Sequence, residues 1–317
     1  MSRTAPSDTR SRRVAAVLAH ALAAAVLAAG CGADSAPVGS IDSAMVHVER
    51  QLSYGPRVPG TPARDRAARY LARTFERYGA RVTLQSFALD DPYSDQPLQL
   101  INIVASFEPE RRKRILLCSH YDSRPWADQE ADSTLWSRPV PGAVDGAAST
   151  GALLEIARVI GRRAPANHGV DIVLFDGEDY GRQGDLEHYL LGSKHFVQNL
   201  GGYRPAGVIL LDMVGGKGTI VRREALSLER SPALVNYVFG RAAALHLAYF
   251  EAVDGTPVYD DHVPFLQAGI PAIDLFGYDY PAWHTVGDDL SQVDRDKLAQ
   301  VITLLVDIVY GTGLPAP

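Results

Sequence analysis

The chain has 317 residues, of which 46% are hydrophobic and 21% are charged, and its formal net charge is −6. This is the composition of an ordinary globular protein, and it excludes a collagen-like, low-complexity or disordered chain. The acidic balance argues against a nucleic-acid partner. Two cysteines cannot form a disulfide framework. Cys118 lies inside an apolar run, so we expect it to be a buried free thiol.

The first 30 residues are predicted to be an export signal rather than part of the fold. Four arginines precede an apolar, alanine-rich run over residues 14–29, which is short for a membrane-spanning helix. The small residues directly before Cys31 resemble a bacterial lipoprotein signal, in which Cys31 would become the lipidated first residue. Such signals usually carry Leu where this chain has Ala28, so export without a lipid, to the periplasm or the medium, stays the alternative.

Residues 31–43 are rich in Gly, Ser and Ala and are predicted to form a tether, which leaves residues 44–317 as one domain. In that domain apolar, β-branched runs alternate with segments of helical spacing. Such alternation predicts an α/β fold, with a mostly parallel sheet and helices on both of its faces. The predicted elements, in chain order, are helix 64–78, strand 100–107, strand 115–118, helix 148–160, strand 170–175, helix 192–200, strand 208–211, helix 232–247, helix 264–268, strand 272–276 and helix 295–310.

Acidic residues and histidines follow the apolar strands at five places along the chain. In an open α/β sheet ligands bind beyond the carboxyl ends of the strands, so we expect these residues to converge. Two imidazoles and three carboxylates are a donor set suited to zinc, and a cation would relieve the repulsion between the carboxylates. Asp145 alone could instead cap the helix predicted from residue 148. The five candidate ligands are His120, Asp145, Asp179, Asp212 and His284.

Glu178 and Asp179 are adjacent and directly follow a predicted strand. One of them could bind the metal while the other acts as a base towards the substrate, as a metal-assisted acyl reaction requires. The chain has no Gly-x-Ser-x-Gly motif, which argues against a serine hydrolase. The long loop over residues 122–142 contains Trp126 and Trp136, and a loop of that length is more often functional than not.

Six motifs occur in an order that resembles the zinc-dependent glutaminyl-peptide cyclotransferases, which are relatives of the M28 zinc aminopeptidases. The resemblance runs from about residue 43 to the C-terminus and implies a single domain of zinc aminopeptidase-like (phosphorylase/hydrolase-like) fold. The motifs are His120-x-Asp122, Gly142-Ala143-x-Asp145-Gly146, Phe175-Asp176-Gly177-Glu178-Asp179, Leu211-Asp212-Met213, Asp260-Asp261-His262-x-Pro264-Phe265 and Trp283-His284-Thr285.

The resemblance also implies an activity and a set of roles. The enzyme would be an acyltransferase that converts the N-terminal glutamine of peptides or proteins to pyroglutamate and releases ammonia. One zinc ion would polarise the γ-carboxamide of the substrate, and a carboxylate would carry the proton from the α-amine to the ammonia. The implied residues are Asp145, Asp179 and His284 as zinc ligands, Glu178 as general acid and base, Asp212 and Asp260 as its hydrogen-bonded acidic partners, and Trp283 and Tyr280 as substrate-binding residues.

Two other functions stay open from the sequence. The first is an aminopeptidase with two zinc ions, in which His120 and Asp212 complete a second metal site and Glu178 activates a bridging water. The second is a non-catalytic surface protein that binds through the same fold. The doubled acid before His262 and the Trp before His284 favour the cyclotransferases. Asp179, which stands where the animal cyclotransferases carry Glu, departs from their pattern. Contact with a membrane is expected only through a lipidated Cys31.

Overall fold

The computed structural model describes residues 1–2 and 37–315, so the predicted export signal and Cys31 lie outside the described residues. The chain from Pro37 onwards is one compact unit. Its first helix, α2 (Ile41–Leu52), begins inside the segment predicted to be the tether. The hydroxyl of Ser40 accepts a hydrogen bond from the backbone N–H of Ser43 and caps this helix, so the tether ends at Ser40. No helix among the described residues is long and apolar enough to cross a bilayer.

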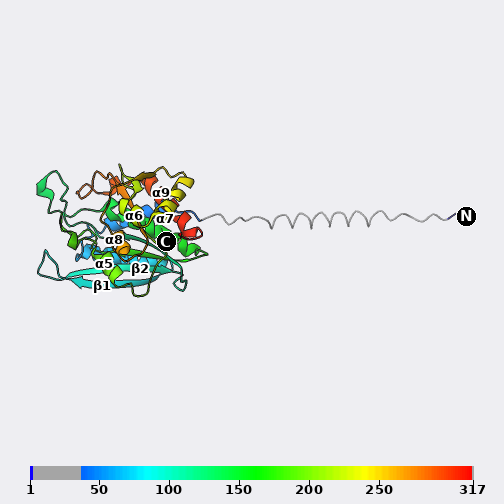
Figure 1. Cartoon of the computed structure of the whole chain (residues 1–317), viewed down its shortest axis with the longest axis horizontal. Helices are drawn as coiled ribbons and strands as arrows, with labels where there is room; N and C mark the ends of the chain where they lie inside the picture. The colour runs from blue at the N-terminus through cyan, green and yellow to red at the C-terminus, as the bar shows by residue number, and fades with distance from the viewer. Residues whose placement is uncertain (3–36, 316–317) are drawn as a thin grey trace. The chain divides into compact units, whose positions relative to one another are not determined.

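A mixed sheet of eight strands forms the centre of this unit, in the order β1-β2-β4-β3-β5-β8-β6-β7. The predicted parallel part consists of its four central strands, which are parallel to one another. Strands β1 and β2 form an antiparallel pair along one side of the domain (Figure 1). The strands are β1 (Arg81–Leu89), β2 (Leu98–Phe107), β3 (Arg114–His120), β4 (Gly169–Phe175), β5 (Val208–Asp212), β6 (Ile220–Arg223), β7 (Phe250–Asp254) and β8 (Ala272–Tyr278).

Three strands at the two edges of the sheet were not predicted. Strand β1 has no buried residue, and β7 is exposed except at Phe250. Strand β6 has four residues, of which only Val221 is buried. Edge strands face solvent along most of their length, so they lack the continuous apolar run that identifies the central strands.

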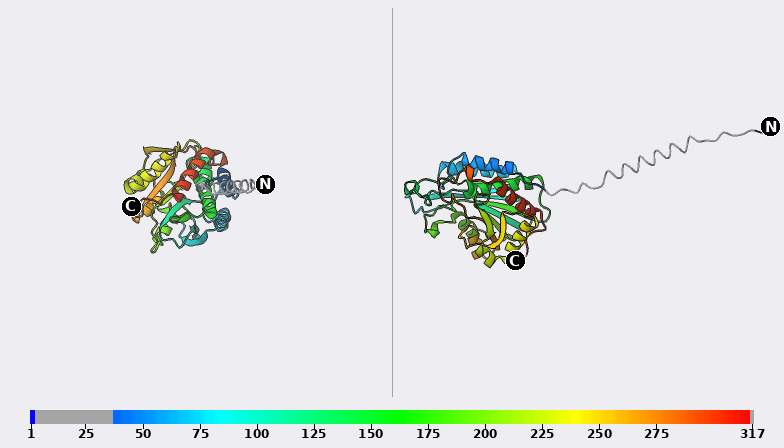
Figure 2. Two further views of the ribbon diagram at one scale, coloured as in Figure 1. Left: turned by 90° about the vertical axis from the view of Figure 1, so that its right-hand side faces the viewer. Right: turned by 90° about the horizontal axis from the view of Figure 1, so that it is seen from above.

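Helices cover both faces of the sheet, as the sequence predicts (Figures 1 and 2). Along β3, Ile115 and Leu117 pack into the larger core beneath α4 and α9. Leu116 and Cys118 point to the opposite face, where they join a smaller core with α5 and α8. Cys118 is a fully buried free thiol, which confirms the expectation for this residue. The helices after α2 are α3 (Pro62–Arg77), α4 (Ser149–Arg162), α5 (Leu191–Gln198), α6 (Ala225–Arg230), α7 (Pro232–Ala244), α8 (His262–Gln267) and α9 (Arg295–Tyr310).

A buried histidine in α2 makes the stability of the fold depend on pH. The ring nitrogens of His47 lie 2.6 Å from the hydroxyl of Tyr70 and 3.0 Å from that of Tyr78. Burial lowers the pKa of His47 from 6.5 to about 4. The neutral form is therefore favoured in the folded state. Its stabilisation is complete above pH 6.5, the unfolded value, and is lost as the pH falls towards 4.

We expect the free energy of unfolding to fall by up to about 3 kcal/mol between pH 6.5 and pH 4 through His47 alone. Urea unfolding measured across this range, for the wild type and for His47→Gln, isolates the contribution, because other groups titrate equally in both proteins. The free energy of unfolding of His47→Gln should depend less on pH than that of the wild type. Identical pH dependence in the two proteins would contradict this account of His47.

Candidate metal centre and active site

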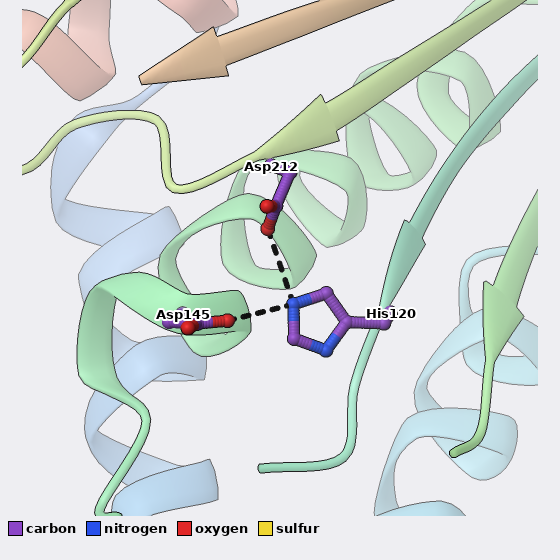
Figure 3. Close-up of side chains that lie close together, drawn as sticks. All are labelled: His120, Asp145 and Asp212. Atoms are coloured by element: carbon purple, nitrogen blue, oxygen red, sulfur yellow. Dashed lines mark hydrogen bonds and ion pairs between the residues drawn. The ribbon is translucent and has the colours of Figure 1, made fainter. Parts of the chain in front are cut away.

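The residues that follow the central strands meet at the carboxyl edge of the sheet. His120 is the last residue of β3, Asp212 is the last residue of β5, and Asp145 lies in the helical turn Ala143–Ala148 that precedes α4. Figure 3 shows the carboxylates of Asp145 and Asp212 directed at the same ring nitrogen of His120. The Nε2 atom of His120 lies 3.0 Å from Oδ1 of Asp145 and 3.1 Å from Oδ1 of Asp212.

A second group of three residues shares Asp145 with the first group. The Nε2 atom of His284 lies 3.4 Å from Oδ2 of Asp179 and 3.8 Å from Oδ2 of Asp145. All five predicted ligands are buried, and in each group one donor atom per residue lies within 4.8 Å of the others. Asp145 does not cap a helix: the N-cap residue of α4 is Ala148, without a side-chain bond. The capping alternative is therefore wrong, and the two groups form one cluster around Asp145.

The group of Asp145, Asp179 and His284 fits a zinc ion. Ligands about 2.0–2.1 Å from a tetrahedral zinc stand about 3.4 Å apart, which is close to the 3.4 and 3.8 Å separations of the donor atoms here. The Oδ2 atom of Asp179 is buried and has no hydrogen-bond partner within the described part of the chain. A cation would satisfy this oxygen, and the nitrogen and oxygen donors are those that zinc prefers.

The long loop over residues 122–142 holds two of these ligands in place. The Nη1 atom of Arg124 donates to Oδ1 of Asp179 at 2.6 Å, which leaves Oδ2 of Asp179 directed at His284. Arg124 also donates two hydrogen bonds to Asp128, at 2.9 and 2.6 Å. Oδ1 of Asp128 in turn lies 3.7 Å from Nδ1 of His284. Sequence reasoning identified the loop by its length but did not identify Arg124 or Asp128.

Arg124→Lys is expected to weaken zinc binding by about 10- to 100-fold. Lysine lacks the planar guanidinium group that contacts Asp179 and Asp128 together. Loss of a residue that is hydrogen-bonded to a metal ligand has effects of this size. Competition with a chelator that reports free zinc measures the change. Arg112→Lys, at an exposed position, is the matched control and should bind zinc as the wild type does. Equal zinc affinity of Arg124→Lys and the wild type would show that Arg124 does not position the ligand.

Asp288 holds the turn that carries Asp145. Its carboxylate accepts hydrogen bonds from the backbone N–H of Val144 at 2.9 Å and of Asp145 at 3.2 Å. The hydroxyl of Tyr280 donates to Asp288 at 2.6 Å, and Tyr280 is buried. The resemblance implies a substrate-binding role for Tyr280; in the structure its hydroxyl donates to Asp288, which holds the turn of Asp145. No motif pointed to Asp288.

Glu178 lies beside the cluster and has a carboxylate free to exchange a proton. Asp122 accepts hydrogen bonds from the backbone N–H groups of Glu178 at 3.2 Å and of Asp179 at 3.3 Å, which fixes both residues after β4. The side chain of Glu178 accepts no hydrogen bond from the described residues, although the residue is only 9% exposed. Burial raises its pKa well above the usual value, and the charges of Asp179 and Asp260 add to this effect.

The pKa values of the other two predicted acidic residues, Asp212 and Asp260, are also raised. Burial raises the pKa of Asp212, and it raises that of Asp260 to about 7 with a further contribution from the charge of Asp212. Neither carboxylate is hydrogen-bonded to Glu178. Asp212 instead contacts His120, and Asp260 accepts from the backbone N–H of Asp261 at 2.5 Å. The predicted hydrogen bonds to Glu178 are thus absent among the described residues, and the three acids interact through their charges.

Trp283 is placed to contact a substrate. Its ring centroid lies 4.1 Å from that of His284, with the two rings tilted by 32°. The residue remains 43% exposed, which is high for a tryptophan that packs on a buried histidine. An exposed aromatic ring that packs on His284 could provide an apolar wall for a ligand.

Comparisons with known proteins agree with this geometry. The structure is similar to the glutaminyl cyclase of Porphyromonas gingivalis, at 38% identity and a TM-score of 0.82, over 86% of this chain and 98% of that one. It is also similar to a Zn-dependent exopeptidase from Parabacteroides distasonis, at 36% identity and a TM-score of 0.84, over 87% of this chain and 100% of that one.

Comparisons with curated sequences and with a family model give a consistent result. A glutaminyl-peptide cyclotransferase-like protein from Bos taurus is 28% identical over 264 residues, which are 73% of this chain and 66% of the bovine protein. Residues 102–309, more than half of the chain, match the model of Peptidase family M28. The chain therefore belongs to peptidase family M28.

Proposed function

We propose that this protein is a zinc-dependent glutaminyl-peptide cyclotransferase, which converts the N-terminal glutamine of peptides to pyroglutamate and releases ammonia. The observation that carries the proposal is Glu178, a buried carboxylate without a hydrogen-bond partner among the described residues. Glu178 precedes Asp179 in the chain, and its raised pKa reflects its burial and the charges of Asp179 and Asp260. The similarity to bacterial and animal glutaminyl cyclases supports the same activity.

Each residue of the proposed site has a different role in the reaction. Asp145, Asp179 and His284 would hold a zinc ion, which would supply Lewis-acid chemistry at the γ-carboxamide oxygen of the substrate. Glu178 accepts a proton from the α-amine as its nitrogen forms a bond to the γ-carbonyl carbon. The bond between that carbon and the amide nitrogen then breaks, and Glu178 returns the proton to the departing ammonia. Trp283 shields the reacting groups on the side of His284.

We assign one zinc ion to the site, for a geometric reason. The donor atoms of Asp145, Asp179 and His284 have the spacing of zinc ligands and leave an oxygen of Asp179 unsatisfied. In the group around His120, Nε2 of His120 is hydrogen-bonded to Oδ1 of Asp212 at 3.1 Å and forms an ion pair with Oδ1 of Asp145 at 3.0 Å. A bound cation would therefore stabilise the group of Asp145, Asp179 and His284 more than the group around His120.

An aminopeptidase with two zinc ions is the second candidate. It is favoured by the presence of a complete second group, in which His120, Asp145 and Asp212 bring their donor atoms within 4.8 Å of one another. A structural neighbour described as a Zn-dependent exopeptidase supports this candidate as well. In that reaction Glu178 would activate a water molecule instead of the α-amine.

The mass of the product separates the two activities. Incubation with a dipeptide that begins with glutamine should yield a product lighter by one ammonia, with an unchanged number of residues. Release of free glutamine would show that the chain is an aminopeptidase. An unchanged dipeptide, with zinc bound, would favour a binding protein.

We further propose that the enzyme acts outside the cytoplasm. Residues 1–30 have the features of an export signal, and the small residues before Cys31 support lipid attachment there. Detection of a lipid on Cys31 by mass spectrometry of the mature protein tests the anchor. An unmodified Cys31 would leave export without an anchor.

A further inference from the structure

An open groove rich in arginine runs between helices α2 and α3, away from the active site. It has a volume of about 620 Å³ and is lined by Arg50, Arg66, Arg69, Arg73 and Arg77, together with Tyr54 and Tyr70. The two helices, drawn in blue in Figure 2, lie at the surface of the domain. All five arginines are exposed. We call these seven residues the arginine groove.

Helical geometry gathers these arginines on one side of α3. Arg66, Arg69, Arg73 and Arg77 are spaced by three, four and four residues, so they share one face of the helix. The opposite face is buried and anchors α3 to the core, for example through Phe75. Because the four arginines are separated by other residues, the sequence shows no basic run, and the groove was not predicted.

The arginines of the groove form no ion pair within the described part of the chain. No carboxylate oxygen of the described residues lies within 4 Å of these five guanidinium groups. Arg50 instead stacks over the ring of Tyr54 at 5.7 Å, Arg66 donates to the carbonyl of Tyr54 at 3.1 Å, and Arg77 donates to the hydroxyl of Thr74 at 2.9 Å. Five unpaired positive charges in one groove of a chain with net charge −6 indicate a surface for an anion.

We propose that the arginine groove binds the phosphate headgroups of an anionic lipid surface. Guanidinium groups match phosphate oxygens in a bidentate way, and tyrosine is favoured at membrane interfaces. The chain between Cys31 and Ser40 spans at most about 32 Å when fully extended. If Cys31 carries the lipid proposed above, α2 is held within that distance of the bilayer, where basic clusters bind anionic lipids.

The experiment uses residues 37–317, which form one compact unit with its own core and carry no tether. Flotation with vesicles of equal parts phosphatidylglycerol and phosphatidylcholine measures binding, and vesicles of phosphatidylcholine alone give the background. We expect binding to the anionic vesicles only, and a loss of binding as salt is added. Replacing Arg66, Arg69 and Arg73 together by Gln should weaken binding about a hundredfold, at about 1 kcal/mol for each arginine.

The matched control removes three exposed arginines outside the groove, as Arg112→Gln, Arg204→Gln and Arg230→Gln, and should bind the anionic vesicles like the parent. Equal losses in the two triple variants would show a general charge effect and overturn the proposal. So would binding of inorganic phosphate or polyglutamate in the groove without binding to vesicles. Conversion of the glutamine dipeptide, measured on both triple variants, should stay at the parent level. This result separates the groove from the proposed function.

Discussion

Glu178→Gln is expected to lower turnover of a glutamine-initiated dipeptide by about a hundred- to ten-thousandfold while zinc stays bound. The substitution keeps the size of the side chain and removes the group that holds the proton, and general acid–base catalysis has effects of this size. The proposed zinc ligands Asp145, Asp179 and His284 are unchanged. Turnover and zinc content should be measured on the same preparation.

Glu110→Gln is the control, because Glu110 is exposed and lies outside the site. It should match the wild type in both turnover and zinc content. Turnover of Glu178→Gln at the wild-type level would reject the role of Glu178 as proton carrier. Loss of zinc from Glu178→Gln would instead indicate that Glu178 is itself a ligand.

His284→Ala is expected to abolish both zinc binding and activity. A site with three protein ligands loses a third of its protein donors, and the affinity should fall by more than the roughly hundredfold effect of removing an outer partner. Asp145 and Asp179 would then face each other without a counter-charge from a metal or from His284. Zinc content by atomic absorption, and turnover with and without added zinc, check the prediction.

A histidine outside the site gives the matched control. His246 is exposed and has a positive φ of 56°, a conformation that asparagine tolerates, so His246→Asn should leave zinc content and turnover unchanged. Retention of one zinc per chain in His284→Ala would show that His284 is not a ligand. Full activity restored by excess zinc would show that it contributes to affinity alone.

The five candidate ligands could be located from the sequence because each follows an apolar strand or a short motif at a strand end, and the structure brings their side chains together. Parallel strands bring such residues together whatever their separation in the chain. Asp122 lies in one of these motifs but its role could not be assigned from the sequence, and no motif contains Asp128 or Asp288. They act through hydrogen bonds or ion pairs with groups such as the backbone N–H of Glu178 or the ring of His284, and no spacing rule encodes those contacts.

The structural features that the sequence did not reveal have related physical causes. The resemblance implies that Tyr280 binds substrate, whereas packing buries this residue and directs its hydroxyl to Asp288, a contact that no motif predicts. The edge strands β1 and β7 were missed because they are largely exposed, and β6 was missed because it has only four residues, of which one is buried. The arginine groove was missed because it is created by the 3.6-residue period of α3 rather than by a run of basic residues.

Stepwise addition of zinc to metal-free protein, with the product of a glutamine-initiated peptide weighed at each step, tests the central claim directly. We predict that activity rises until one zinc is bound per chain and then stays constant, and that the only product is the peptide lighter by one ammonia. Activity that keeps rising to a second zinc, with free glutamine released, would contradict the account.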